Sequence, residues 1–175
     1  MIEAAKVFKI PIYVSEQYPK GLGRTAKDVK IDDATLVYEK TLFSMYTPEL
    51  QQKLAKDVPE LNAVLLCGIE AHVCIEQTVI DLLNKDIAVH ILADGVSSRS
   101  HMDRGLALQV IIHQYNIDSI HCVHKLRLSA LGCFVTTSEN VLFKLLRDKD
   151  HPAFKSISKL NKLPTVDTLG YTSKL

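Results

Sequence analysis

The stretch AVLLCGIEAHVCIEQTVIDLL, residues 63–83, decides the fold of this chain. Its first residues form a short apolar run of the kind found in buried strands, and the remainder has the three- and four-residue apolar spacing of a helix. A strand that leads directly into a helix is the repeating unit of α/β folds. This pattern places Cys74 in the first turn of the helix. Exposed N–H groups and the macrodipole stabilise a thiolate there, so Cys74 is the candidate nucleophile.

Other short apolar runs in the chain also have the length and composition of buried strands. Together with the run above, they are residues 10–14, 36–38, 63–67, 88–92 and 133–135. Helical spacing fills the stretches between them, and this alternation predicts a parallel sheet with helices on both faces. The predicted fold class is therefore α/β, a doubly wound Rossmann-like parallel sheet in a single domain.

The sequence also predicts helix starts and apolar helix faces. Ser100 with Asp103, and Thr136 with Glu139, have the spacing of capping pairs. Two helices near the C-terminus each place apolar residues on one face, which are Val141, Leu142, Leu145 and Leu146 in the first helix and Phe154, Ile157 and Leu160 in the second. We expect the face of the second helix to pack within the protein, with a partner subunit as the alternative.

The composition narrows the class of protein. A chain of 175 residues suits one domain, and its 21 basic and 20 acidic side chains are nearly balanced. Without a block of Lys and Arg, we expect no nucleic-acid partner. The apolar runs are shorter than the roughly 20 residues that span a bilayer, and the N-terminus does not resemble a signal peptide. We therefore expect a soluble intracellular protein without a membrane partner.

The four cysteines are Cys67, Cys74, Cys122 and Cys133. They form no C-x-x-C pair and are too few for a disulfide scaffold, so reduced thiols are expected. We interpret all except Cys74 as small hydrophobic side chains.

The chain ends in Ser173, Lys174 and Leu175. This tripeptide is the signal read by the peroxisomal import receptor. We interpret residues 161–175 as a tail that carries this signal. The sequence thus predicts the import receptor as a partner and the peroxisomal matrix as the location, with the cytoplasm as the alternative.

Polar residues follow the predicted strands where an α/β sheet binds its ligand. Glu16 and Gln17 follow the first strand, and Glu39 and Lys40 follow the second. The carboxyl ends of the strands form the ligand crevice of such sheets. Because an ammonium stabilises both a thiolate and an anionic intermediate, Lys40 is the candidate partner of Cys74. A core thiol and a surface amine are the alternatives at this point.

Four segments resemble the isochorismatase-like cysteine hydrolases, in particular the eukaryotic isochorismatase-domain-containing branch. They are GIEAHVCIEQTVIDLL, ADGVSSRSHMDR, TTSE and YVSEQYPKGLG. The resemblance implies a hydrolase domain over residues 1–160, a six-stranded parallel sheet, a homo-oligomer and no cofactor. Residues 110–131 do not share in it, because the family passes through this region in a turn about a dozen residues shorter.

The resemblance also implies a mechanism. Amidase-type members use an Asp-Lys-Cys triad whose thiolate attacks an amide or imide carbonyl, and water then hydrolyses the acyl-enzyme. Cys74 matches the nucleophile and Lys40 the lysine. A non-proline cis peptide between Ile69 and Glu70 is implied as well, with the N–H groups of Glu70 and Cys74 forming the oxyanion hole. Tyr18, Phe43 and Ser44 are candidates for lining the pocket of a small-molecule substrate.

The chain departs from the family in three places. The triad aspartate and the first, central strand lie upstream of the matching segment, so we expect a fragment, an incomplete gene model or another segment in that place. SEQYPKGLG replaces the metal-binding pattern of nicotinamidases, and we expect no metal. Residues 110–131 contain His113, His121, Cys122 and His124, but their spacing fits no zinc finger and favours an insertion or a translated intron.

Two hypotheses of different class follow. The leading one is a hydrolase that uses Cys74 and Lys40 on a small amide, imide or related acyl compound, impaired by the missing aspartate. The alternative is a catalytically inactive family member that serves as an oligomeric interaction or scaffold protein. A redox-sensing thiol is the weakest interpretation, because it needs a resolving cysteine near Cys74.

Overall fold

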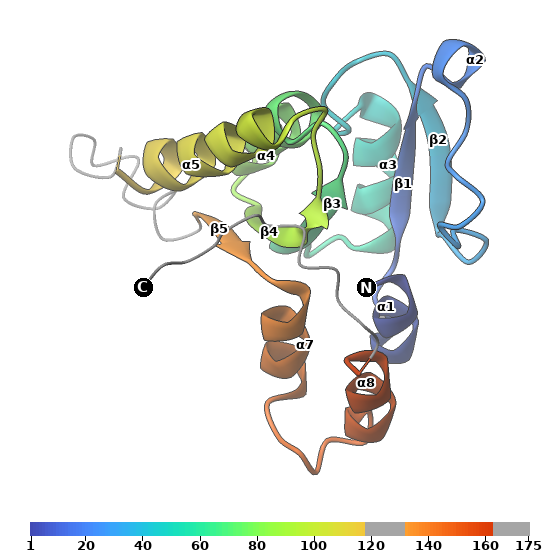
Figure 1. Ribbon diagram of the computed structural model, residues 1–175. Helices are drawn as coiled ribbons and strands as arrows, with labels where there is room; N and C mark the ends of the chain where they lie inside the picture. The colour runs from blue at the N-terminus through green and yellow to red at the C-terminus, as the bar shows by residue number, and fades with distance from the viewer. Residues whose placement is uncertain (118–131, 163–175) are drawn as a thin grey trace. The chain divides into compact units, whose positions relative to one another are not determined.

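The computed structural model describes residues 1–117 and 132–162, and the side chains of residues 1–111 and 132–162. In chain order the elements are α1 Ile2–Phe8, β1 Tyr13–Gln17, α2 Pro19–Leu22, β2 Leu36–Lys40, α3 Pro48–Asp57, β3 Ala63–Gly68, η1 Ala71–Ile75, α4 Glu76–Leu83, β4 Ala88–Val96, α5 His101–Ile117, β5 Cys133–Thr136, α7 Ser138–Leu146 and α8 Phe154–Leu160 (Figure 1). The described strands pair in parallel and alternate with helices, which confirms the α/β class. Within the described ranges, no helix has the length and apolarity to cross a membrane.

The described chain separates into two compact units. The first unit contains Met1–Leu42 and the described part of Ser138–Val166, and the second contains Phe43–Thr137. β1 pairs with β2 in the first unit, and the second unit has a three-stranded sheet in the order β3-β4-β5. All five predicted strands are present. The first begins three residues later than predicted, at Tyr13, because Pro11 has no N–H to donate to a strand ladder.

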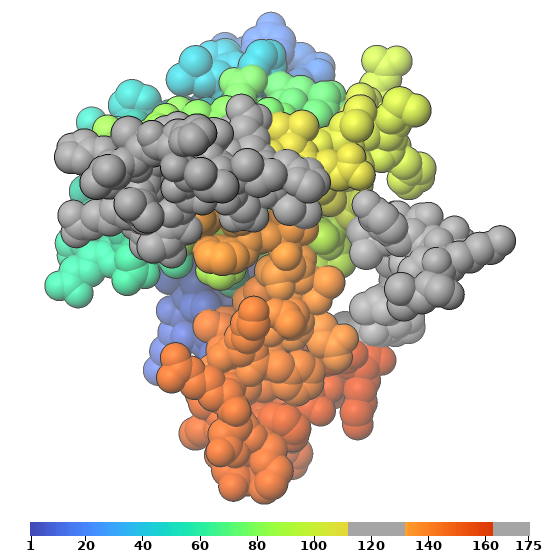
Figure 2. Space-filling view, turned by 90° about the vertical axis from the view of Figure 1, so that its left-hand side faces the viewer, coloured from blue at the N-terminus to red at the C-terminus, as the bar shows by residue number. Residues whose placement is uncertain are grey.

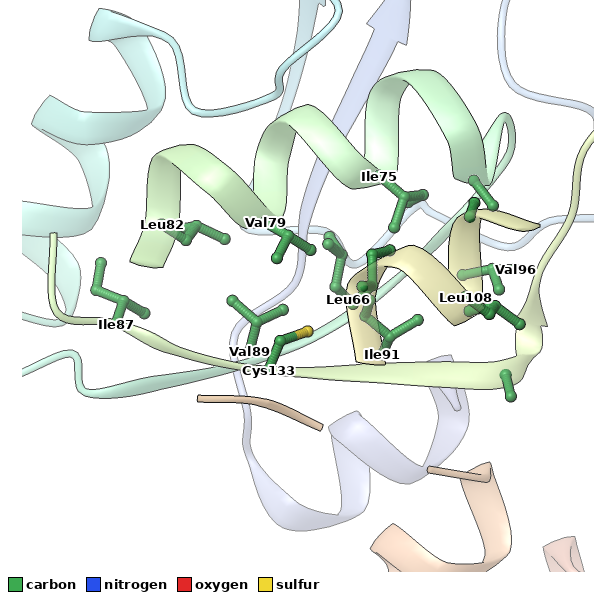
Figure 3. Packing of buried hydrophobic residues seen from close by; sticks show 14 residues of the cluster. Leu66, Ile75, Val79, Leu82, Ile87, Val89, Ile91, Val96, Leu108 and Cys133 are labelled. Carbon is green, nitrogen blue, oxygen red and sulfur yellow. The ribbon is translucent and has the colours of Figure 1, made fainter. Parts of the chain in front are cut away.

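The core of the second unit lies on one face of the β3-β4-β5 sheet. Figure 3 shows Val79 and Leu82 on the side of α4 that faces β4, with Val89 and Ile87 on the opposite side of this core. The buried residues of this cluster come from the strands, from η1 and α4, and from α5, and they include Leu66, Ile75, Ile91, Leu108, Ile111 and Cys133. Alternate strand residues point to the same face, which explains why Val89 and Ile91 are both buried here.

The first unit has its own smaller core. Ala4 of α1, Leu142 and Leu146 of α7, and Ile157 of α8 form it, with Phe154 and Leu160 packed against it. The predicted face of α8 is therefore confirmed. On α7, Val141 is buried, whereas Leu145 is 39% exposed. Figure 2 shows the surface of α7 and the residues after it in orange.

The predicted capping pair of Ser100 and Asp103 is confirmed. The Asp103 N–H donates to Ser100 Oγ at 3.0 Å, and Ser100 Oγ donates to the Asp103 carboxylate at 2.7 Å. These reciprocal contacts satisfy an otherwise unpaired N–H at the start of α5. Thr136 ends β5, and α7 begins two residues later at Ser138, so the pairing of Thr136 with Glu139 stays a prediction.

Arg104 fastens α5 to the end of β4. Its guanidinium is buried, with Nε donating to the Val96 carbonyl at 2.8 Å and Nη2 donating to the Ala93 carbonyl. Both carbonyls belong to the part of β4 where its register against β3 shifts, and a charged donor satisfies them inside the fold. Arg104 therefore fixes the loop that leads from β4 into α5.

Candidate active site

Cys74 lies in the helical turn that follows β3, as predicted. β3 ends at Gly68, and η1 carries the chain through Cys74 into α4. The reversal between strand and helix takes place at Glu70, whose backbone is left-handed with φ 58° and ψ 65°. Cys74 is half-buried. Cys74 is therefore not among the fully buried residues of the core.

One expectation about this turn needs correction. The cis peptide expected between Ile69 and Glu70 is wrong, since the described residues contain no cis peptide bond. The left-handed Glu70 reverses the chain instead, and it turns its carbonyl into the start of the helix. That oxygen accepts the N–H groups of Val73 at 3.0 Å, Cys74 at 3.0 Å and Ile75 at 3.4 Å. The Cys74 N–H is thus engaged in a helical bond rather than turned toward an oxyanion, and its oxyanion-hole role stays a prediction.

The end of β4 holds this turn in place. The Ala71 N–H donates to the Ser97 carbonyl at 2.9 Å and to Ser98 Oγ at 3.0 Å. Ser98 Oγ also lies 3.2 Å from His72 Nδ1, and a Glu70 carboxylate oxygen lies 3.5 Å from the same nitrogen. The segments that follow β3 and β4 therefore meet at the carboxyl ends of their strands, as parallel sheets require.

A buried hydroxyl anchors the Cys74 turn from the other side. Thr78 Oγ1 donates to the Cys74 carbonyl at 2.6 Å and accepts the Met45 N–H at 2.9 Å. Thr78 is 1% exposed, so these two partners satisfy a polar group that burial would otherwise penalise. Thr78 is not among the predicted site residues, although a threonine four residues after Cys74 on an apolar helix face is a usable signal.

Lys40 is a buried residue of the first unit, not a surface amine. It ends β2 and is 8% exposed. Its Nζ donates to Gln17 Oε1 at 2.5 Å and to the Leu42 carbonyl at 2.8 Å. Because Lys40 and Cys74 belong to different units, their pairing stays a prediction.

Glu16 organises the loop between β1 and β2. Its buried carboxylate accepts the Thr25 N–H at 2.8 Å and the Thr25 hydroxyl at 2.9 Å, and it pairs with Arg24 at 2.6 Å. Arg24 also pairs with Glu39 at 2.6 Å. The hydrogen bonds from Thr25, followed by the contact with Arg24, lower the pKa of Glu16. The ionised carboxylate therefore contributes to the stability of this loop.

This network predicts a pH-dependent effect of Glu16→Gln. We expect the variant to unfold at lower urea concentration than the natural chain at pH 7, because the amide cannot replace the carboxylate's contacts. A lowered pKa means that the carboxylate stabilises the fold fully above pH 4.5 and loses this effect as the pH falls through the folded pKa. The difference in urea midpoint between the variant and the natural chain should narrow below pH 4.5. Glu39→Gln, which changes a more exposed carboxylate, is the control. A Glu16→Gln difference in urea midpoint that stays constant down to pH 2 would contradict the prediction.

The three predicted pocket residues differ in their surroundings. Ser44 is buried, and its Oγ accepts the Tyr46 N–H at 3.1 Å, whereas Phe43 is 51% exposed. The Tyr18 ring lies over Gly21, where a Cβ would meet its ring carbon at 2.4 Å. A side chain at position 21 would therefore displace the Tyr18 ring, which is itself exposed. The role of all three residues in a pocket stays a prediction.

The other described thiols have less reactive environments. Burial raises the pKa of the Cys133 thiol to about 12, and this residue is fully buried in the core as predicted. The surrounding atoms also desolvate the Cys67 thiolate and raise its pKa, although Cys67 retains exposed surface, contrary to the expectation of a buried hydrophobic side chain. Cys122 lies outside the described residues. A raised pKa lowers the thiolate fraction at neutral pH and slows reaction with electrophiles.

The structure gives no cluster of metal ligands in the part of the chain that it describes: no three His, Cys, Asp or Glu side chains there are placed to hold an ion. The side chains of His113, His121, Cys122 and His124 lie outside that part. So do Ser173, Lys174 and Leu175.

Comparison with known proteins finds a family model and relatives that share one domain description. The family model described as "Isochorismatase domain" matches residues 1–118. Isochorismatase domain-containing protein 1 of Danio rerio is 43% identical over 175 residues, which is 100% of this chain and 55% of the relative. Isochorismatase domain-containing protein 2 of Xenopus laevis is 42% identical over 168 residues, covering 96% of this chain and 73% of the relative. The chain thus spans about half the length of the Danio rerio protein.

Solved structures share the fold. The structure described as MAR1 ribonuclease from Caenorhabditis elegans is 38% identical, with a TM-score of 0.79, covering 99% of this chain and 81% of the other. The nicotinamidase of Staphylococcus aureus, 17% identical with a TM-score of 0.57, covers 77% of this chain and 78% of its own. At this low identity the likeness concerns the fold alone.

Proposed function

Because the chain belongs to the isochorismatase family, we propose that it is a hydrolase acting through Cys74 on a small amide, imide or related acyl substrate. The observation that supports this proposal is the position of Cys74, which is half-buried in the turn between β3 and α4. The Cys74 thiol gives up its proton, the thiolate attacks the carbonyl carbon and forms a C–S bond, and the C–N bond breaks as the nitrogen leaves with that proton. Water then cleaves the thioester, releasing the acid and restoring the thiol.

Lys40 is the proposed partner of the thiolate and of the anionic intermediate. Its ammonium is held by acceptors at the carboxyl end of β2, the edge at which α/β sheets bind ligands. A fixed positive charge favours the thiolate and the developing oxyanion. The sequence contains no match to the family's triad aspartate, so we expect turnover by these 175 residues alone to be lower by about 10²- to 10⁴-fold.

The nucleophile assignment predicts that Cys74 reacts first. We expect iodoacetamide to label Cys74 of the folded protein at pH 7.5 faster than Cys67, and to leave Cys133 unmodified until the protein unfolds. The raised pKa values of Cys67 and Cys133 are the physical reason. Peptide mass spectrometry over a time course measures all three rates in one sample. Equal labelling rates for Cys74 and Cys67 would contradict the assignment of Cys74 as the nucleophile.

An oligomeric scaffold is the second candidate, favoured by an exposed apolar stripe on α5. Met102, Leu106 and Val110 follow one another at intervals of four residues and are 74%, 53% and 38% exposed. Exposed apolar stripes of this kind mark protein interfaces, and a homo-oligomer is the proposed assembly. Substrate analogues separate the two functions: a thermal shift lost in the Cys74→Ala, Lys40→Ala double variant supports the hydrolase, and partner binding indifferent to both changes supports the scaffold.

RNA is a further substrate to include in the assay, because the Caenorhabditis elegans relative is described as a ribonuclease. The nearly balanced charge of this chain does not favour binding to a phosphate backbone. We therefore propose small acyl compounds rather than RNA as the substrate class. RNA cleavage that persists in the Cys74→Ala variant would favour RNA instead.

The final residues predict a location. A fluorescent protein extended by residues 164–175 is expected to become punctate and to overlap a peroxisomal marker, because the free Ser-Lys-Leu end is read by the import receptor. The matched control adds one glycine after Leu175, which blocks recognition of the end. Diffuse fluorescence of both fusions would leave the cytoplasm as the location.

A further inference from the structure

Gln17 and Lys40 form a side-chain pair across the two strands of the first unit. They are register partners at the carboxyl ends of β1 and β2, and Gln17 Oε1 lies 2.5 Å from Lys40 Nζ. Register partners on parallel strands project to the same face of the sheet. The preceding register pair, Glu16 and Glu39, projects to the opposite face, where both carboxylates pair with Arg24.

The orientation of the Gln17 amide is fixed by its second contact. Nε2 donates to the Thr41 carbonyl at 2.8 Å, and a carbonyl can only accept a hydrogen bond. This contact leaves Oε1 facing Lys40 Nζ, which carries only donors. The amide therefore bridges the end of β1 to the residue after Lys40 and accepts from the ammonium at the same time.

We propose that Gln17 is a positioning residue that holds the Lys40 ammonium at the end of β2, an inference that rests on the proposed role of Lys40. A lysine side chain has several rotatable bonds and loses rotamer freedom when it is fixed. Gln17 Oε1 and the Leu42 carbonyl supply two directed acceptors to the buried ammonium. The amide performs this function without adding a negative charge beside the ammonium, which a glutamate at the same position would do.

The test compares Gln17→Glu and Gln17→Ala in the full chain, by the pH dependence of Lys40 acetylation with N-hydroxysuccinimidyl acetate. Only the neutral amine reacts. Gln17→Glu keeps the shape and adds a charge, so we expect the Lys40 profile to move to higher pH by about one unit or more. Gln17→Ala removes an acceptor from the charged form, so we expect movement to lower pH. Opposite shifts of the Lys40 profile in the two variants support the proposal. Unchanged profiles, or shifts of both variants in the same direction, overturn it.

Gln51→Ala provides the matched control. Gln51 Nε2 also donates to a backbone carbonyl, that of Tyr46 at 3.0 Å, but it belongs to the second unit. We expect this variant to leave the Lys40 profile unchanged. If Gln17→Ala does not fold, the nearly isosteric Gln17→Glu still decides the outcome through the upward shift.

A second measurement separates this inference from the proposed function. The rate at which iodoacetamide alkylates Cys74 is followed across pH in the same variants. Slower alkylation of Cys74 in both Gln17 variants supports both the positioning role of Gln17 and the pairing of Lys40 with Cys74. Opposite Lys40 shifts with unchanged Cys74 rates support Gln17 as the positioning residue and overturn the pairing of Lys40 with Cys74.

Discussion

Replacing Cys74 by serine is expected to lower the hydrolysis of a small amide or imide by about 10³- to 10⁶-fold, the range typical for loss of a nucleophile. Serine keeps nearly the shape of cysteine, with a smaller and more polar hydroxyl in place of the thiol. It does not preserve the acidity, because a hydroxyl in the same turn stays protonated near neutral pH. The loss should therefore appear in kcat and in kcat/KM rather than in KM alone.

The matched control for this prediction is Cys67→Ser. Cys67 lies in β3 upstream of the same turn, and its pKa is raised by desolvation. We expect this variant to retain the hydrolysis rate of the natural chain. A panel of amides and imides is followed by release of ammonia or amine, with intact-protein mass spectrometry to trap the acyl-enzyme. Comparable losses in the two variants would show that a thiol in this region matters for folding and not for chemistry.

The fold was predictable from sequence where local patterns coincide with burial. Apolar runs located all five strands, since parallel strands covered by helices must be apolar throughout. The boundaries of β1 depended on Pro11, and the exposure of Leu145 depended on how α7 is rotated against its neighbours. Such rotations are set by tertiary packing, which periodicity within one helix cannot specify.

The candidate site was predictable in its residue types but not in its hydrogen bonds. The position of Cys74 at a helix start followed from the strand-to-helix pattern. The capture of its N–H by the Glu70 carbonyl depends on one left-handed residue, for which a glutamate gives no sequence signal. Gln17 was noted at a strand end, but its contact with Lys40 requires the register of β1 against β2. Registers between distant strands arise only in the folded protein.

Arg104→Met is expected to destabilise the second unit by about 3 to 5 kcal/mol, because it removes a buried charged donor and leaves two carbonyls behind. Methionine keeps much of the apolar stem volume, so the loss reports on the hydrogen bonds to Val96 and Ala93 rather than on a cavity. Urea unfolding followed by circular dichroism measures the change. Arg104→Lys should recover part of it, since an ammonium supplies donors without the planar fork of the guanidinium.

Arg99→Met is the matched control for this change. Arg99 lies in the same loop between β4 and α5, is exposed, and carries the same charge. We expect its replacement to alter stability by less than about 0.5 kcal/mol, as is usual for surface positions. The loop contains Ser97 and Ser98, which hold the Cys74 turn through the Ala71 N–H, so Arg104→Met should also change the rate of Cys74 alkylation. An unchanged alkylation rate in a destabilised Arg104→Met variant would show that the loop and the thiol turn are held independently.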